Sequence, residues 1–134
     1  MDYQTLTSTL RSYYSLKKDL KRIEERIAQL EYDMQNVKGV QYDKIPSTPN
    51  NIQNELRMLM MIERKSILEK GKEQTQSLIA RLKTILEAEL EPYEPMVRNC
   101  LIRNAKGETL EQLADEYGYT KSGLWKKLKK EVEK

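Results

Sequence analysis

The sequence contains no histidine and only one cysteine, Cys100. Histidine is the commonest general base and the commonest metal ligand, so its absence argues against catalysis and against a metal site. A single cysteine cannot form an internal disulfide, and no signal peptide or long apolar run is present, which favours a reducing, cytoplasmic setting. Paired carboxylates, metal-ligand spacings and phosphate-binding loops are also missing. We therefore expect neither an enzyme nor a cofactor.

Residues that interrupt helices are scarce as well. The 134 residues include four prolines and five glycines, whereas 34% are charged. This composition is typical of long, solvated helices and predicts an all-α protein. The length fits one compact domain, or a small domain carried on an extended helical element. The net charge of +3 is too small to indicate nucleic-acid binding, so the distribution of charge is more informative.

The first part of the chain carries a heptad pattern. Apolar residues recur in alternating steps of three and four, with Thr9 as the one polar position. A pattern sustained over more than four heptads predicts a long helix over about residues 3–38. Gly39 and the prolines after it predict a turn over residues 39–49. The apolar positions are Leu6, Tyr13, Leu16, Leu20, Ile23, Ile27, Leu30, Met34 and Val37.

A second helical pattern covers about residues 50–90 and stops before Pro92. Its apolar stripe is interrupted around Gly71, which is compatible with a kink or loosened pairing. Two patterns of similar length with a short connection predict an antiparallel helical hairpin, a coiled coil formed by residues 1–91. Because two helices bury little, we expect the hairpin to form a homodimer. The predicted stripe contains Ile52, Leu56, Leu59, Ile62, Ile67, Leu78, Leu82, Ile85 and Leu86.

Pro92 and Pro95 mark a change of architecture, and we assign residues 92–134 to a second domain. Pro95 suits the first turn of a third helix that runs to about Asn104. Cys100 falls on the apolar face of this helix. We interpret it as a buried structural thiol rather than a nucleophile, since the chain has no histidine to activate it.

The stretch TLEQLADEYGYTKSGLWKKLKK, residues 109–130, holds two short helical patterns around Gly118. Thr109 begins a capping-box signature for the first helix, and Thr120 suits the N-cap of the second. Gly118 permits a sharp turn between them, with Tyr119 expected in the core. Together with the preceding helix, these features predict a three-helix helix-turn-helix unit.

The outward face of the second short helix is basic, which predicts that it lies in the major groove of double-stranded DNA. In that position its N-terminal half reaches base edges and its flanking lysines neutralise phosphates. Lysine can donate to guanine, serine can contact several bases, and a tryptophan ring can pack against a thymine methyl group. The first backbone N–H groups of the helix are placed to hold a phosphate. The candidate DNA-binding residues are Thr120, Lys121, Ser122, Trp125, Lys126, Lys129 and Lys130.

Two other interpretations of this basic helix stay open. The lysines can form an ordinary solvated face, with Trp125 folded back onto apolar neighbours. A basic amphipathic helix can also bind an anionic membrane. However, the narrow stripe of Leu124, Leu128 and Val132 is needed to close the three-helix core, so we expect no membrane partner.

The stretch at residues 109–130 resembles region 4 of sigma-70-type factors. The whole chain is similar to the ArpU/RinA-type late-transcription regulators of phages and prophages in Gram-positive bacteria. In that family an N-terminal helical pair, often with a segment like GVQYDK at residues 39–44, precedes a C-terminal sigma-4-like helix-turn-helix. The resemblance implies a sequence-specific, DNA-binding transcription regulator in the bacterial host cell, with RNA polymerase as a further partner.

A coiled-coil interaction module is the alternative function. The hairpin would then bind a repressor, a polymerase subunit or a phage packaging component, and the C-terminal domain would dock without binding DNA. A small terminase subunit is a third alternative, since these proteins also join helix-turn-helix units to coiled coils.

Overall fold

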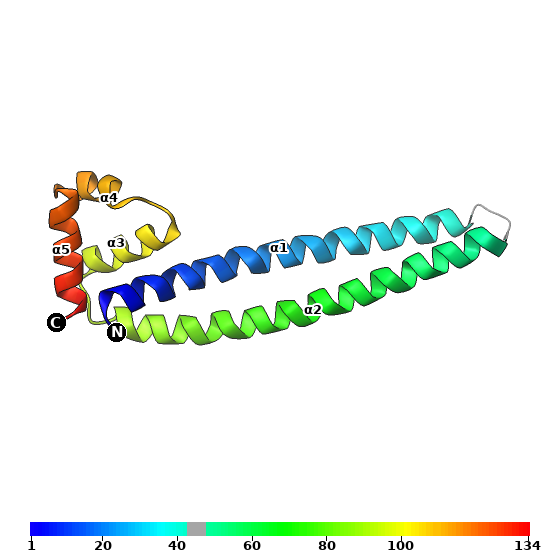
Figure 1. Cartoon of the computed structure of the whole chain (residues 1–134), viewed down its shortest axis with the longest axis horizontal. Helices are drawn as coiled ribbons and strands as arrows, with labels where there is room; N and C mark the ends of the chain where they lie inside the picture. Colours follow the sequence, from blue (N-terminus) through cyan, green and yellow to red (C-terminus); the bar gives the residue numbers. More distant parts are fainter. Residues whose placement is uncertain (43–47) are drawn as a thin grey trace. The chain divides into compact units, whose positions relative to one another are not determined.

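The computed structural model describes the backbone of residues 1–42 and 48–134 and the side chains of residues 1–37 and 52–134. All of its regular elements in these ranges are helices. The two long helices α1 and α2 form an antiparallel hairpin, and three short helices follow (Figure 1). The predicted all-α fold, with a long hairpin before three C-terminal helices, is confirmed. In chain order the helices are α1 (Tyr3–Tyr42), α2 (Thr48–Leu90), α3 (Pro95–Lys106), α4 (Leu110–Tyr117) and α5 (Lys121–Val132).

The first helix is longer than predicted. α1 continues to Tyr42, so the prediction that it ends at residue 38, before Gly39, is wrong. One glycine inside a helix costs only about 1 kcal/mol relative to alanine, and a long helix tolerates that cost. α2 begins at Thr48 rather than near residue 50. Of the predicted turn over residues 39–49, residues 43–47 lie outside the described ranges.

The chain packs as two compact units, which we describe separately. The hairpin unit contains residues 18–77. The five-helix unit contains residues 1–17 and 78–134, so it joins the start of α1 and the end of α2 to the three short helices. The predicted domain boundary at residue 92 follows the change from long to short helices. Packing, by contrast, extends the C-terminal unit to both helices of the hairpin.

One apolar core holds the five-helix unit together. Cys100 lies in this core at 0% exposure, and burial raises the pKa of its thiol. Both observations agree with the predicted structural role of this cysteine. Every helix contributes to the core, which consists of Leu6, Leu10, Tyr13, Leu86, Leu90, Val97, Cys100, Leu101, Leu113, Ala114, Leu124, Leu128 and Val132.

At the start of α1, the core position is taken by Leu10 and not by Thr9. Leu10 is 1% exposed, whereas Thr9 is partly exposed and its hydroxyl donates to the Thr5 carbonyl at 2.7 Å. Strict heptad spacing assigned this core position to Thr9, because that spacing assumes a single partner helix. In the five-helix unit the first turns of α1 share a core with the short helices as well as with α2, so a wider apolar face is buried.

The apolar stripe predicted for α2 is mostly exposed to solvent, so this prediction is wrong for most of its members. The side of α2 that faces α1 in the hairpin unit carries Lys65, whose ammonium lies 3.3 Å from the Glu31 carboxylate, and Leu68, which lines a groove with Leu30. Two apolar rows run along α2, and periodicity alone does not show which of them meets the partner helix. Leu82 is half-buried and Leu86 is buried, but the exposed members are Ile52, Leu56, Leu59, Ile62, Ile67, Leu78 and Ile85.

Replacing each of two glycines by alanine is expected to change the stability of the protein in opposite directions. Gly118 has a φ of 77°, a left-handed conformation in which a Cβ atom costs about 1–2 kcal/mol. Gly71 lies inside the continuous helix α2 with open space around its Cα atom, and alanine is the better helix former there by about 0.5–1 kcal/mol. In urea unfolding followed by circular dichroism, Gly118→Ala should therefore lower stability and Gly71→Ala should raise it. Shifts of the same sign would contradict these backbone assignments.

Candidate nucleic-acid interface

A three-residue turn, residues 118–120, joins α4 to α5. The N–H groups of Gly118 and Tyr119 both donate to the Ala114 carbonyl, the latter at 2.8 Å. Thr120 then begins α5, because its hydroxyl oxygen accepts a hydrogen bond from the Gly123 N–H at 3.0 Å. The predicted sharp turn at Gly118 and the predicted cap at Thr120 are confirmed.

The start of α4 is also capped as predicted. The Thr109 hydroxyl accepts from the Gln112 N–H at 3.2 Å, and the Gln112 side chain accepts from the Thr109 N–H at 3.1 Å. This reciprocal pair satisfies two donors that an uncapped helix would leave unpaired. Thr109 thereby fixes where α4 begins, and the left-handed Gly118 fixes where it ends.

Small and branched apolar side chains close the corner between α4 and α5. Ala114 is 1% exposed, as expected where two helices approach closely, and Leu113, Leu124 and Leu128 are fully buried. Gly123 lies at the start of α5, where an added Cβ atom would come within 2.9 Å of the Thr120 hydroxyl oxygen. Leu124 and Leu128 thus place the inward face of α5 in the core, and the other faces of α5 carry the candidate residues.

Tyr119 does not anchor the turn in the core, so that prediction is wrong. Its side chain is 38% exposed, and the ammonium of Lys127 lies 5.8 Å from the centre of its ring. The turn is fixed instead by hydrogen bonds to the Ala114 carbonyl and by the Thr120 cap. These local bonds make a buried ring at position 119 unnecessary.

An ion-pair network that the sequence did not reveal connects α3 to α4. The Arg103 guanidinium donates to the Glu108 carboxylate and lies 2.6 Å from a carboxylate oxygen of Glu116. The Asn104 side chain adds a hydrogen bond to the Glu108 carbonyl at 2.9 Å. The two glutamates lie five and thirteen residues after Arg103, not the three or four of a helical pair, so spacing gave no signal for these ion pairs. The single positive charge of Arg103 is thus shared between two carboxylates.

The Arg103–Glu116 contact predicts an acid-sensitive element. The hydrogen bond that the Glu116 carboxylate accepts from Arg103 holds the pKa of this carboxyl below its ordinary value. The stabilising effect of this ionised carboxylate is therefore present above the ordinary glutamate range, near pH 4.3, and is lost as pH falls through the depressed pKa. We expect Arg103→Met to raise the Glu116 pKa toward the ordinary range in an NMR titration. An unchanged Glu116 titration in that variant would contradict the contact.

The candidate lysines of α5 differ in their surroundings. Lys121 lies 3.6 Å from the Glu111 carboxylate, and the ammonium of Lys129 lies 5.0 Å from the centre of the Trp125 ring. Lys126 and Lys130 are exposed and lie in no ion pair within the described part of the chain. These last two lysines are therefore the candidate cations that a phosphate or a base would meet with the least competition from the protein.

Trp125 is only partly available on this surface. Its side chain is 39% exposed, and its ring meets the Tyr3 ring edge-on, with centroids 6.5 Å apart and an interplanar angle of 84°. The backbone N–H of Tyr3 also donates to the Glu133 carboxylate at 3.5 Å. One side of α5 is thus bounded by the start of α1. The folded-back interpretation of Trp125 holds in part, through this contact between residues near opposite ends of the sequence.

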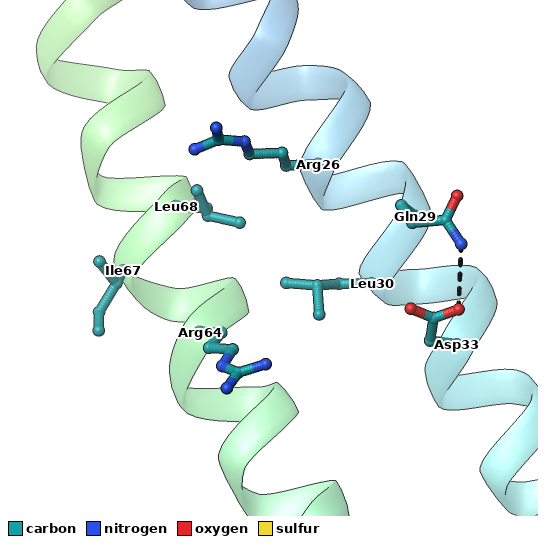
Figure 2. A pocket seen from close by; sticks show the side chains of 7 residues that line it. All are labelled: Arg26, Gln29, Leu30, Asp33, Arg64, Ile67 and Leu68. Carbon is teal, nitrogen blue, oxygen red and sulfur yellow. Dashed lines mark hydrogen bonds between the residues drawn. The ribbon is translucent and has the colours of Figure 1, made fainter.

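A groove between α1 and α2 in the hairpin unit is the second surface of interest. Figure 2 shows Leu30 and Leu68 pointing toward one another across it, with Arg26 and Arg64 beside them. At its edge the Gln29 side chain donates to the Asp33 carboxylate at 3.0 Å. Charges of both signs surround the apolar floor, so the groove does not select a ligand of one charge.

Comparison with known proteins found no match: no family model, curated protein or solved structure matches the chain. Within the described ranges, no helix combines the length and the apolar character that crossing a membrane requires. No group of three acidic or cysteine side chains that could hold a metal ion lies in those same ranges.

Proposed function

We propose that this chain is a sequence-specific DNA-binding transcription regulator of phage or prophage origin, and that α5 enters the major groove. The observation that carries the proposal is the pair of capped helices joined by three residues and closed by buried leucines. In a helix-turn-helix, this arrangement leaves one face of the second helix free to meet base edges. The resemblance of residues 109–130 to sigma-70 region 4 supports the same assignment.

The candidate residues divide into two roles in this proposal. Lys126 and Ser122 lie in the N-terminal half of α5 and contact base edges, where lysine donates to guanine. Lys130 lies further along and contacts phosphate, which adds affinity without sequence preference. Thr120 keeps its hydroxyl proton free to donate to a phosphate, because its oxygen already accepts from Gly123.

A homodimer formed through the hairpin fits this function. Two copies double the number of phosphates that are neutralised, and a two-fold axis lets the pair read two half-sites in the DNA. The resemblance to late-transcription regulators adds RNA polymerase as a further protein partner.

Selection of binding sites from a pool of random DNA duplexes tests the proposal. The full-length chain should enrich one sequence, and its affinity for that sequence should fall as salt concentration rises, because lysine–phosphate contacts release counterions. The same selection at low and physiological salt separates specific from non-specific binding. A chain that enriched no sequence and bound no duplex at low salt would overturn the proposal.

A protein-interaction module is the second candidate function. The observation that favours it is the exposed apolar row on α2, since contiguous apolar surface marks sites of protein contact. Under this alternative, substitutions on the outer side of α2 abolish binding to the protein partner, and Lys126→Ala has no effect on it. Lys126→Ala therefore separates the two functions, because it weakens DNA binding and leaves the contact with the protein partner unchanged.

A further inference from the structure

The outer side of α2 in the hairpin unit carries a row of exposed apolar side chains. Leu56, Leu59 and Ile67 are 55%, 59% and 69% exposed, and Figure 2 shows Ile67 pointing away from α1. Over the described residues of the same unit, α1 exposes only one large apolar side chain, Tyr32. A partner that buries apolar surface of this unit would therefore meet α2 and not α1. Further exposed side chains on α2 are Ile52, Met60 and Ile62.

Two opposite charges lie in the same row. Steps of three and four residues place Glu63 between Leu59 and Ile67, and Lys70 follows Ile67 by three positions. Glu63 and Lys70 are both exposed, and neither takes part in an ion pair among the residues that the structure describes. The row is thus acidic on one side of Ile67 and basic at nearly the same distance on the other.

We infer that this row binds a second copy of the same chain, with the two α2 helices antiparallel and a two-fold axis beside Ile67. In this register Glu63 of each copy faces Lys70 of the second copy, and Ile67 packs against its own counterpart. A two-fold axis requires such a self-complementary surface. A parallel, in-register pair would instead place Glu63 opposite Glu63 and Lys70 opposite Lys70, and these like charges repel.

The row is long enough to pair two helices. With the axis beside Ile67, residues 59–74 of the two copies lie side by side over about four helical turns, or about 22 Å. In this register Leu59 of each copy lies against the aliphatic stem of Gln74 of the second copy, on either side of the central pair of Ile67 side chains. The inference specifies the surface of the hairpin dimer that the proposed function includes, but it does not depend on DNA binding.

Sedimentation equilibrium of the full-length chain without DNA tests this surface. The parent should form a dimer whose fraction rises with protein concentration. Ile67→Asp should weaken the dimer by about a hundredfold or more, because it places two carboxylates together at the two-fold axis. Glu24→Lys, which changes an exposed charge on α1, is the control and should leave the dissociation constant unchanged. Circular dichroism should show the same helicity in both variants as in the parent.

A charge exchange tests the orientation. Glu63→Lys alone and Lys70→Glu alone should each weaken the dimer by about tenfold, because each places like charges opposite one another. The double variant Glu63→Lys/Lys70→Glu should restore the parent dissociation constant within about threefold, because it exchanges the partners of an antiparallel pair. A parent that stayed monomeric up to millimolar concentration would overturn the inference. A dimeric parent whose double variant was as weak as the single variants would overturn it as well, whatever the outcome of the DNA selection.

Discussion

Replacing Leu6 with alanine should lower the free energy of unfolding of the five-helix unit by about 2–5 kcal/mol. Leu6 is 0% exposed and lies in the same core as Leu113, Leu124 and Leu128, although it belongs to the first turns of α1. Its truncation removes apolar contacts and leaves a cavity that the surrounding helices fill only in part. Fluorescence of Trp125, the one tryptophan of the chain, reports unfolding of this unit in urea.

Ser8→Ala is the matched control for this substitution. Ser8 is exposed on the same helical turns, so its replacement should change the free energy of unfolding by no more than about 0.5 kcal/mol. If Leu6→Ala unfolded at the same urea concentration as Ser8→Ala, the start of α1 would not belong to the core of the C-terminal helices.

Replacing Lys126 with alanine should weaken binding to the selected DNA sequence by about 1–3 kcal/mol and relax the preference at one base pair. Lys126 is exposed near the N-terminal half of α5, where a helix-turn-helix reads bases. Lys130→Ala should instead weaken binding to all sequences alike and reduce the slope of log K against log salt by about one unit. Fluorescence anisotropy at several salt concentrations measures both effects.

Lys83→Ala removes an exposed lysine from α2 and serves as the control, because it has the same net charge as each of the two test variants. It should bind the selected DNA like the parent. If Lys126→Ala and Lys130→Ala lost no more affinity than this control, α5 would not be the DNA-reading helix.

The parts of the fold that the sequence predicted depend on local contacts. Thr109, Gly118 and Thr120 act within four residues of their own positions, through caps and a left-handed turn, so their residue types were sufficient. Cys100 was placed correctly for a similar reason, because it shares one face of a short helix with Val97 and Leu101. Such signals do not require knowledge of what lies across the core.

The parts that the sequence did not predict depend on contacts between distant segments. On α2 both the inner and outer rows contain leucine, isoleucine and methionine, and only the position of α1 distinguishes them. Leu10 is buried because the start of α1 has several neighbours, and the Tyr3–Trp125 contact joins opposite ends of the chain. For the candidate site, the sequence supplied the basic helix but not the pairing of Lys121 with Glu111 or the partial cover of Trp125.

DNA cleavage directed from α5 tests the central claim most directly, namely that this helix lies in the major groove. A cysteine introduced as Lys130→Cys can carry an iron chelate that cuts nearby DNA, while the native Cys100, buried at 0% exposure, stays unlabelled. The account predicts cuts confined to the selected sequence, in two clusters about one helical turn or a multiple of it apart if two copies bind. Cleavage spread evenly along the duplex, like that of the free chelate, would contradict it.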